Sequence, residues 1–288
     1  MSQVVMSEPA DRRQVRPTAT EAAWDRLMTL QADLTIPLEL EFYRTCAEWR
    51  RARSVLDMGT GNGHYIRRLA AQFPEKRYIG IDNCDAYVGI AESRQVVGAH
   101  GGDLPVEFRV TDVFDAVGPY DIVIARLLVQ HLGINSDGPS RESQLSQFLD
   151  RIADVLRPGG ALLVIESYDA ERLFYPVIEP MDAFFATLRR HRLEHGCNRD
   201  AGSILTELAL QRGFLLSKRA IHVIPSTLRN HRSLFLKTYL SVLEVVQQNF
   251  AIDVDYDEIR HALFDWYQVP WSYAQIGVSM SCYRLRGG

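Results

Sequence analysis

The stretch from Ser54 to Gly63 constrains the fold of this chain more than any other. It reads SVLDMGTGNG, and the amphipathic run HYIRRLA follows it directly. The short apolar run predicts a buried strand, and the glycines predict a tight turn that admits a ligand close to the backbone. The periodic run predicts a helix whose N-terminus faces that ligand. The segment therefore predicts a strand–turn–helix unit with a nucleotide-type site at its turn.

The details of the turn distinguish two kinds of nucleotide site. Dinucleotide-binding turns follow the pattern G-x-G-x-x-G/A, whereas the glycines here are Gly59, Gly61 and Gly63, with a histidine at position 64. Asp57 stands two residues before the first glycine. A carboxylate at this position would repel a pyrophosphate, but it would attract a cationic ligand.

At these residues the sequence resembles the class I S-adenosylmethionine (SAM) methyltransferases. Their first motif has the form D-x-G-x-G-x-G, and Asp57 through Gly63 fill every position of it. SAM carries an ammonium and a sulfonium and no phosphate, which agrees with an acid in this turn. The resemblance implies an α/β fold with a doubly wound, seven-stranded, mostly parallel sheet of Rossmann-like type, whose last strand is antiparallel.

Four further motifs follow at the spacing of alternating strands and helices. RYIGID ends in Asp82, VEFRVTD ends in Asp112, YDIVIA begins at Tyr120, and LRPGGALLVIE ends in Glu166. An acid that ends the second strand can accept both ribose hydroxyls, and the resemblance gives this role to Asp82 and places Asp112 at the adenine amino group. The SAM-binding residues that the resemblance implies are Asp57, Gly59, Thr60, Gly61, Asp82, Asn83, Asp112, Val113 and Arg126.

The chain is expected to contain a tail, a helical lid and a methyltransferase core. Residues 1–18 are polar and aperiodic, which predicts a disordered tail. Apolar residues recur at helical spacing over residues 19–50, and Pro37 interrupts them, so two helices are expected before the first strand. In similar enzymes such helices form a lid over SAM, whereas periodicity alone is equally compatible with a structural buttress. The core spans residues 51–288 and carries helical insertions at about 168–200 and 226–272, which form an added cap.

Charge and hydropathy restrict the partners and the compartment. The 288 residues carry a net charge of -4, and their basic residues form no sustained cluster, which argues against a nucleic-acid partner. No apolar run is long enough to span a membrane, and no signal peptide is recognisable. We therefore expect a cytoplasmic protein without a membrane partner. Its expected partner is a small-molecule substrate, and a homodimer remains an open alternative to a monomer.

The cysteines and histidines do not form a recognisable metal motif. His191 and His195 are four residues apart, but Arg192 stands where H-E-x-x-H has its glutamate, and no third ligand is evident. The sequence therefore predicts no metal, and equally no disulfide framework, because its cysteines are scattered and form no C-x-x-C pair. The four cysteines are Cys46, Cys84, Cys197 and Cys282.

Three functional classes are compatible with these motifs. The first is a SAM-dependent methyltransferase (EC 2.1.1) that acts on a small molecule. The second is a non-catalytic SAM-binding relative or a module for another ligand, and the third is an NAD-type oxidoreductase. The acids Asp57, Asp82 and Asp112 favour the first, and His64 after Gly63 disfavours the third. RLLVQHL after the fourth strand lacks the D/N-P-P-Y/F signature of enzymes that methylate bases or glutamine, which argues against nucleic-acid and protein substrates.

Two residues are candidates for a catalytic base. Glu166 ends the fifth strand beside the expected methyl donor, and it is either a base or an acceptor that braces a backbone turn. His131 stands where substrate-side residues lie in similar small-molecule enzymes, and it either faces the pocket or braces its loop. Aromatic residues in the cap predict a planar, electron-rich, neutral or cationic acceptor. The candidates to contact this acceptor are Trp24, Tyr43, Tyr168, Phe185 and Trp271.

The overall layout also resembles bacterial enzymes of secondary metabolism, including the indole C3-methyltransferases that make pyrroloindoline alkaloids. This resemblance covers the order of the elements and no residue motif. It implies methyl transfer to a small aromatic natural product, with indole C3 and the O- or N-methylation of another metabolite as alternatives. A base that removes the indole N–H proton would assist attack by carbon.

Overall fold

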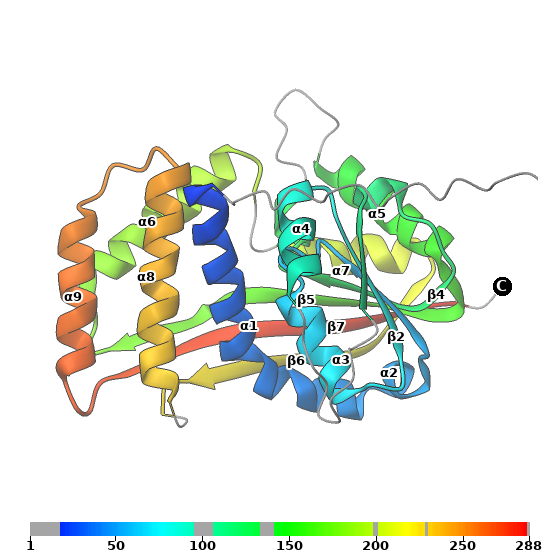
Figure 1. Cartoon of the computed structure of the whole chain (residues 1–288), viewed down its shortest axis with the longest axis horizontal. Helices are drawn as coiled ribbons and strands as arrows, with labels where there is room; N and C mark the ends of the chain where they lie inside the picture. The colour runs from blue at the N-terminus through cyan, green and yellow to red at the C-terminus, as the bar shows by residue number, and fades with distance from the viewer. Residues whose placement is uncertain (1–17, 95–105, 133–140, 198–200, 228–229, 287–288) are drawn as a thin grey trace, which may run out of the picture.

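The computed structural model describes residues 18–94, 106–132, 141–197, 201–227 and 230–286. Apart from Thr18, the predicted disordered tail at residues 1–18 lies outside this range. Within the described residues, no helix combines the length and the apolar character needed to cross a bilayer. Figure 1 shows a central sheet with helices on both faces and a group of long helices at one end.

The described residues form one seven-stranded sheet of order β3-β2-β1-β4-β5-β7-β6 (Figure 1). Strands β1 to β5 pair in parallel, whereas β7 is antiparallel to both of its neighbours. The predicted doubly wound, mostly parallel sheet with an antiparallel last strand is therefore confirmed. The strands are β1 (Ser54–Met58), β2 (Arg77–Asp82), β3 (Val106–Val110), β4 (Tyr120–Arg126), β5 (Leu156–Tyr175), β6 (Phe214–Pro225) and β7 (Tyr273–Leu285).

Helices cover both faces of this sheet. Apolar residues of α5 and α7 pack on one face, and those of α1 to α4 pack on the other, where the core continues into α6, α8 and α9. The α-helices are α1 (Ala19–Thr45), α2 (Ala47–Arg51), α3 (His64–Gln72), α4 (Asp85–Ser93), α5 (Arg141–Val155), α6 (Glu179–Glu194), α7 (Ala201–Gln211), α8 (His231–Asn249) and α9 (Tyr256–Gln268). Two short 3₁₀ turns complete the set, η1 (Val113–Asp115) and η2 (Val129–His131).

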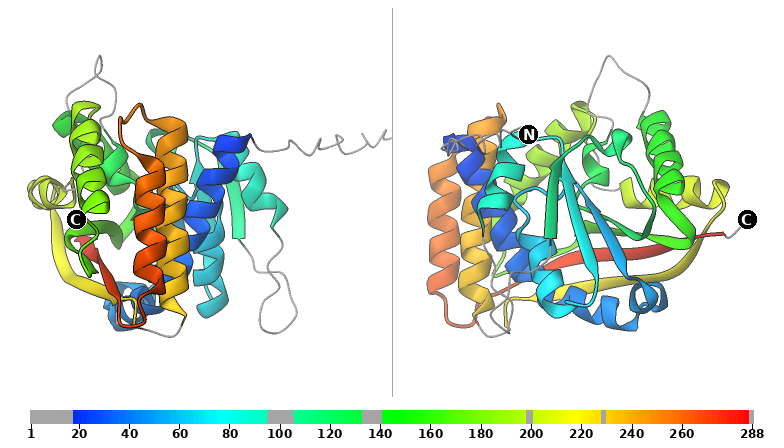
Figure 2. Two further views of the ribbon diagram at one scale, coloured as in Figure 1. Left: turned by 90° about the vertical axis from the view of Figure 1, so that its left-hand side faces the viewer. Right: turned by 45° about the vertical axis from the view of Figure 1, so that its right-hand side comes forward.

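Strands β5, β6 and β7 extend beyond the other strands and carry the cap helices α6, α8 and α9 (Figures 1 and 2). The first insertion, expected as helical from about residue 168, instead begins as a continuation of β5 to Tyr175 and becomes helical only at Glu179. Pairing of Phe174 with Ala274 of β7 satisfies the backbone there, and the Phe174 side chain is buried. Sheet pairing therefore outweighs the local helical pattern.

Helix α1 runs through Pro37 and ends at Thr45, so the predicted break at this proline is wrong. A proline inside a helix removes one backbone hydrogen bond. Burial of Ile36 and Leu40 on either side of it offsets this loss. At its start the helix has a complete capping box, in which the backbone N–H of Glu21 donates to the Thr18 hydroxyl at 3.2 Å and that of Thr18 donates to Glu21 at 2.7 Å.

The turn after β1 depends on glycine at Gly59, Gly61 and Gly63. Their φ angles of 69°, 55° and 68° lie in the left-handed region, which residues with a Cβ rarely adopt. Space is restricted as well, because a Cβ on Gly61 would lie 2.5 Å from the sulfur of Met28 in α1. The glycines therefore allow both the turn itself and the close approach of α1 over it.

We predict that Gly63→Ala destabilises the protein by at least about 1–2 kcal/mol, because the left-handed backbone becomes strained. The new methyl group would also approach the ring of Phe108 to within 2.6 Å. The matched control is Gly89→Ala on the exposed side of α4, where a Cβ meets nothing within 4 Å. In this control the free energy of unfolding is expected to rise by about 0.5–1 kcal/mol. Denaturant unfolding measures both, and equal effects would contradict the role given to the turn.

Candidate functional site

A pocket of about 500 Å³ lies at the carboxyl ends of β1, β2 and β4 and beside the middle of β5. The strand order reverses between β1 and β4, and ligands of open α/β sheets bind in the crevice beyond such a point. Helices α1, α6 and α8 supply the opposite wall. One continuous pocket thus joins the glycine turn to the cap.

Two acids hold the glycine turn from within this pocket. The hydroxyl of Thr60 donates to Asp57 at 2.8 Å, and the backbone N–H of Gly61 donates to Asp82 at 2.9 Å. The other Asp82 oxygen accepts from the backbone N–H of Cys84 at 3.0 Å. Each carboxylate oxygen keeps a second lone pair, so Asp82 can still accept from a ligand.

Burial shifts the protonation of both acids. It raises the pKa of Asp57 to about 7, although the hydrogen bond from Thr60 and the charge of Arg126 oppose the shift. Burial likewise raises the pKa of Asp82, against the backbone donors of Cys84 and Gly61. A positively charged ligand in the pocket would favour the ionised forms again. The electrostatics of the turn therefore suit a cation.

Arg126, at the end of β4, joins three elements around the pocket. Its Nη2 donates to the hydroxyl of Thr35 at 2.9 Å, and its Nε lies 3.5 Å from Oε1 of Glu39, both in α1. Its guanidinium carbon lies 4.3 Å from the ring centroid of Tyr65 in α3. Glu39 is only 1% exposed, so a buried anion balances the buried cation.

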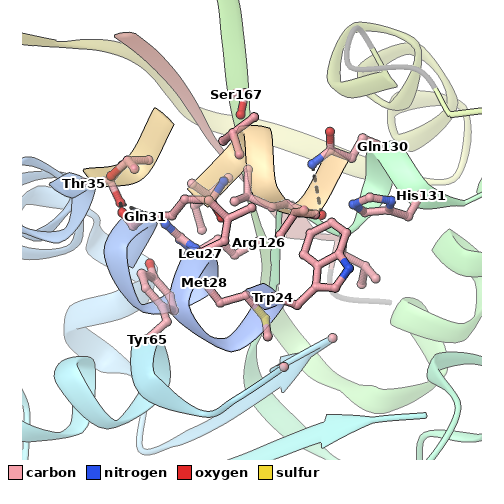
Figure 3. Close-up of a pocket in the computed structure, with 18 of the residues that line it drawn as sticks. Trp24, Leu27, Met28, Gln31, Thr35, Tyr65, Arg126, Gln130, His131 and Ser167 are labelled. Atoms are coloured by element: carbon pink, nitrogen blue, oxygen red, sulfur yellow. Dashed lines mark hydrogen bonds between the residues drawn. The ribbon is translucent and has the colours of Figure 1, made fainter. Parts of the chain in front are cut away.

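One face of α1 forms a wall of the pocket. Trp24, Met28, Gln31, Thr35 and Glu39 all line it, at spacings that place them on a single helical face. Figure 3 shows Met28, Gln31 and Thr35 beside Tyr65 and Arg126. The sequence prediction named only Trp24 of these five, although the spacing of residues 24, 28, 31, 35 and 39 on one helical face was a usable signal.

Hydrogen bonds fasten α1 to the glycine turn. Nδ2 of Asn62 donates to Oδ1 of Asp25 at 2.7 Å and to the hydroxyl of Thr29 at 2.9 Å. Nε2 of His64, at the start of α3, lies 2.9 Å from Oδ1 of Asp33. Helix α1 is therefore bound to the segment that forms the other side of the pocket.

The cap half of the pocket is largely apolar and aromatic. Phe185 of α6 packs edge-on against Tyr239 of α8, with ring centroids 5.8 Å apart. The guanidinium carbon of Arg172 lies 3.7 Å from the centroid of the Phe185 ring. Arg172 lies within an irregular part of β5, where the pairing with β7 shifts between Tyr168 and Leu173. Such bulges redirect side chains, and Tyr168 and Arg172 both line the pocket.

Residues 56–162 match the family model of a methyltransferase domain. This segment is therefore similar to a methyltransferase domain, and the sheet that contains it has the class I strand order. Trans-aconitate 2-methyltransferase of Acidovorax sp. (strain JS42) is 27% identical over 162 residues, which cover 45% of this chain and 57% of that protein. The match thus spans little more than half the length of this curated relative.

Two solved structures share the fold with a TM-score of 0.51. Phosphoethanolamine N-methyltransferase 2 of Haemonchus contortus, solved with phosphomonomethylethanolamine and S-adenosylhomocysteine, is 17% identical and covers 96% of this chain and 60% of its own. The [4+2]-cyclase SpnF is 16% identical and covers 95% of this chain and 98% of its own. At these identities the likeness shows the fold alone, and the name of the second structure shows that the fold does not fix the reaction.

The methyltransferase pocket brings together most of the residues singled out from the sequence. It is lined by Asp57, Gly59, Thr60, Gly61, Asp82, Asn83, Arg126, His131, Trp24, Tyr168 and Phe185. His131 and Trp24 lie at the same end of the pocket as Gln130 (Figure 3). The pocket lining does not include Glu166, Asp112, Val113, Tyr43 or Trp271.

Glu166 lies behind the pocket wall, so its assignment as a catalytic base is not supported. Its neighbours Ile165 and Ser167 line the pocket, and side chains alternate between the two faces of a strand. Its carboxylate is buried and accepts a hydrogen bond at 2.8 Å from the backbone N–H of Val129, at the start of η2. Of the two roles considered for it, bracing a backbone turn is the one that this geometry fits.

The other four residues occupy structural positions. Asp112 caps η1 by accepting from the backbone N–H of Phe114 at 2.9 Å, and Val113 packs against the apolar core on the α5 side of the sheet. Tyr43 is fully buried one layer behind Tyr65, and the two hydroxyls are 2.6 Å apart. Trp271 follows α9, is 63% exposed and packs beside Tyr175. The predicted acceptor contacts of Tyr43 and Trp271 are therefore corrected. The second oxygen of Asp112 accepts from Nδ2 of the pocket residue Asn83 at 3.5 Å, so the adenine contact of Asp112 and the SAM contact of Val113 stay predictions.

Asp57→Asn should change how stability depends on pH. The folded protein holds a proton on Asp57 up to about pH 7, whereas the unfolded chain releases it near the ordinary value of 3.8. The wild-type protein should therefore lose free energy of unfolding as pH rises between these values, and the variant should lose less. Urea unfolding at pH 5 and pH 8 compares the two.

Asp121→Asn provides the matched control. Three donors from Arg53 and Ser54 hold the Asp121 carboxylate, and these bonds lower its pKa against the effect of burial. The ionised Asp121 carboxylate stabilises the fold, and this stabilisation is lost only at more acidic pH. The variant should therefore show the same change in free energy of unfolding between pH 5 and pH 8 as the wild type. If the change in free energy of unfolding between pH 5 and pH 8 is equal in the wild type and Asp57→Asn, the raised pKa of Asp57 is contradicted.

For Glu166, we predict an effect on stability rather than on chemistry. Glu166→Leu leaves the backbone N–H of Val129 buried without its acceptor, which costs about 1–3 kcal/mol. Glu166→Gln keeps an oxygen acceptor and should cost less, with turnover close to that of the wild type. Denaturant unfolding and a turnover assay together check both variants. A large fall in the turnover of a fully folded Glu166→Gln protein would restore the catalytic role.

Proposed function

We propose that this protein transfers a methyl group from SAM to a small molecule held beneath α6 and α8. The observation that carries the proposal is that a single pocket contains both the glycine turn and the apolar cap residues. Methyl transfer from a sulfonium is a direct displacement, so the protein must mainly align acceptor, methyl and sulfur and exclude water. One enclosed space that holds both molecules meets this requirement.

The residues of the turn fit SAM. Asp82, with one lone pair free on each carboxylate oxygen, suits the ribose hydroxyls. The glycines let the backbone approach the ligand closely, and Asp57 suits the cationic methionine end. Arg126 lies among these acids and suits the carboxylate of that end. When bound, SAM supplies the electrophilic methyl group, and these residues hold it in place.

The cap residues support an aromatic acceptor. Trp24, Tyr168, Phe185 and Tyr239 contribute rings to the pocket, and planar ligands pack well against such rings. His131 lies at the rim of the same pocket and is the residue that we propose takes a proton where the acceptor must lose one. Indole C3 is one acceptor atom that these features accommodate, beside a nitrogen or oxygen of another aromatic metabolite.

Arg172 and Arg192, which also line the pocket, favour a second candidate acceptor, a carboxylic acid. Guanidinium groups bind carboxylates through paired hydrogen bonds. Transfer would then form a methyl ester at a carboxylate oxygen and leave S-adenosylhomocysteine, with no proton to remove. The name of the Acidovorax relative, trans-aconitate 2-methyltransferase, agrees with this alternative. Turnover on a panel of indoles, phenols, amines and carboxylic acids distinguishes the candidates.

The two halves of the pocket should respond differently to substitution. Asp82→Asn removes a charged acceptor and should weaken S-adenosylhomocysteine binding by about 1.5–3 kcal/mol, which is roughly 10- to 150-fold. Phe185→Ala should leave that affinity unchanged and raise KM for the acceptor. Calorimetry and steady-state kinetics measure the two effects, and thermal unfolding verifies that each variant is folded.

NADH provides the negative control for the cofactor. It should neither bind in calorimetry nor raise the unfolding temperature, whereas S-adenosylhomocysteine should do both. Stabilisation by NADH alone would contradict the proposed cofactor. Binding of S-adenosylhomocysteine without turnover on any acceptor would instead indicate a non-catalytic relative.

A further inference from the structure

Two cysteines that are far apart in the sequence lie close together at the C-terminal end of α1. Cys46 lies between α1 and α2, and Cys282 lies in β7. Their sulfur atoms and a carboxylate oxygen of Glu48 in α2 all lie within 4.8 Å of one another. Cys46 is 1% exposed and Cys282 is fully buried. The prediction of no metal rested on the scattered cysteines, and only the fold brings these two together.

The spacing of the donor atoms approaches that of a tetrahedral metal site. Sγ of Cys46 lies 3.4 Å from Oε2 of Glu48. With zinc bonds of about 2.3 Å to sulfur and about 2.0 Å to oxygen, the edge of a tetrahedron between these two atoms is about 3.5 Å. One edge of the site is therefore already present, and the second sulfur lies within 4.8 Å of both of these atoms.

Ser217 brings a fourth donor to the same place. The pairing of β6 with β7 shifts between Leu216 and Lys218, so Ser217 lies at a bulge opposite Cys282. Its hydroxyl donates to the backbone carbonyl of Cys282 at 3.3 Å, which leaves the hydroxyl oxygen able to bind a cation. Bulges often serve to redirect a side chain toward a site.

The chemistry of this cluster favours a cation over a disulfide. Two buried thiols and a partly buried carboxylate are a donor set that zinc prefers. A disulfide would use only the two sulfurs and would give the carboxylate and the hydroxyl no role.

We propose that Cys46, Glu48 and Cys282 bind one zinc ion, with the Ser217 hydroxyl or a water molecule as the fourth ligand. Binding releases the two thiol protons and forms two zinc–sulfur bonds and one zinc–oxygen bond. Such a site is structural, and it fastens the junction of α1 and α2 to strand β7. It thereby holds the C-terminal end of α1, whose earlier turns line the cofactor pocket.

A second cluster of donor atoms serves as an internal comparison. His191, Glu194 and His195 at the end of α6 also bring their ligand atoms within 4.8 Å of one another, but His195 and Glu194 are exposed. This cluster contains no thiol. Cobalt bound there would lack the sulfur-to-metal absorption band that cobalt bound by cysteine shows, so one spectrum separates the two sites.

The test is a Co²⁺ titration of the full-length, reduced, chelator-treated protein. One equivalent should produce a thiolate-to-cobalt band in the near ultraviolet together with the visible bands of tetrahedral Co²⁺. Cys46→Ser and Cys282→Ser should lose the thiolate band, while Cys84→Ser and His191→Ala should keep it. Zn²⁺ should displace the cobalt, and it should raise the unfolding temperature of the wild type but not that of Cys282→Ser.

Glu48→Gln keeps the proposal testable if the serine variants fail to fold. This residue is only partly buried, and its replacement should weaken Co²⁺ binding at least tenfold. Absence of a thiolate band from the folded wild-type protein would overturn the proposal. A Cys46–Cys282 disulfide found by peptide mapping, together with unchanged cobalt affinity in Glu48→Gln, would also overturn it, in favour of a redox pair.

Discussion

The buried charge of Arg126 is the constraint on which the arrangement of this site depends. A guanidinium at the end of a central strand is costly to bury unless an anion lies beside it, and Glu39 of α1 supplies that anion. Losing either partner from such a pair typically costs about 3–5 kcal/mol, because it leaves the other charge uncompensated. The position of α1 across the carboxyl ends of the strands is therefore coupled to the core. Helix α1 is a wall of the pocket as well as its cover.

Features that depend on neighbouring residues could be predicted from the sequence. Features that depend on contacts with distant residues could not. The glycine turn and the acids Asp57 and Asp82 could be predicted because a strand, a turn and a helix start follow from contiguous residues. Glu166 could not be assigned to a face of β5, because strand parity depends on register, and a one-residue shift exchanges the two faces. The extension of β5 to Tyr175 and the continuous helix at Pro37 depend on packing against distant segments, which outweighs local preference.

One segment of the chain matches the methyltransferase family model, and the cap helices lie outside that match. The matched methyltransferase domain, residues 56–162, contains the glycine turn and the first four strands. The cap helices α6, α8 and α9 lie outside that match, and α6 and α8 contribute Phe185, Arg192 and Tyr239 to the pocket. The same fold is found in a structure named as a cyclase, so the fold does not determine the reaction. Residues that the cap helices bring to the pocket are therefore the place to look for what determines it.

The continuity of β5 and β7 has a mechanical consequence for this protein. Both strands run from the cofactor side of the sheet into the cap, and eleven residue pairs join them on the two sides of the irregularity between Tyr168 and Leu173. Paired strands resist bending, so in the described residues a strand pair, and not a flexible linker about which separate domains rotate, joins the cap to the core. Ligand exchange would then require single helices to shift rather than a domain to swing open. Over evolution, changes in acceptor preference would accumulate on the inner faces of α6 and α8, since the cap that the described residues form shares its strands with the core.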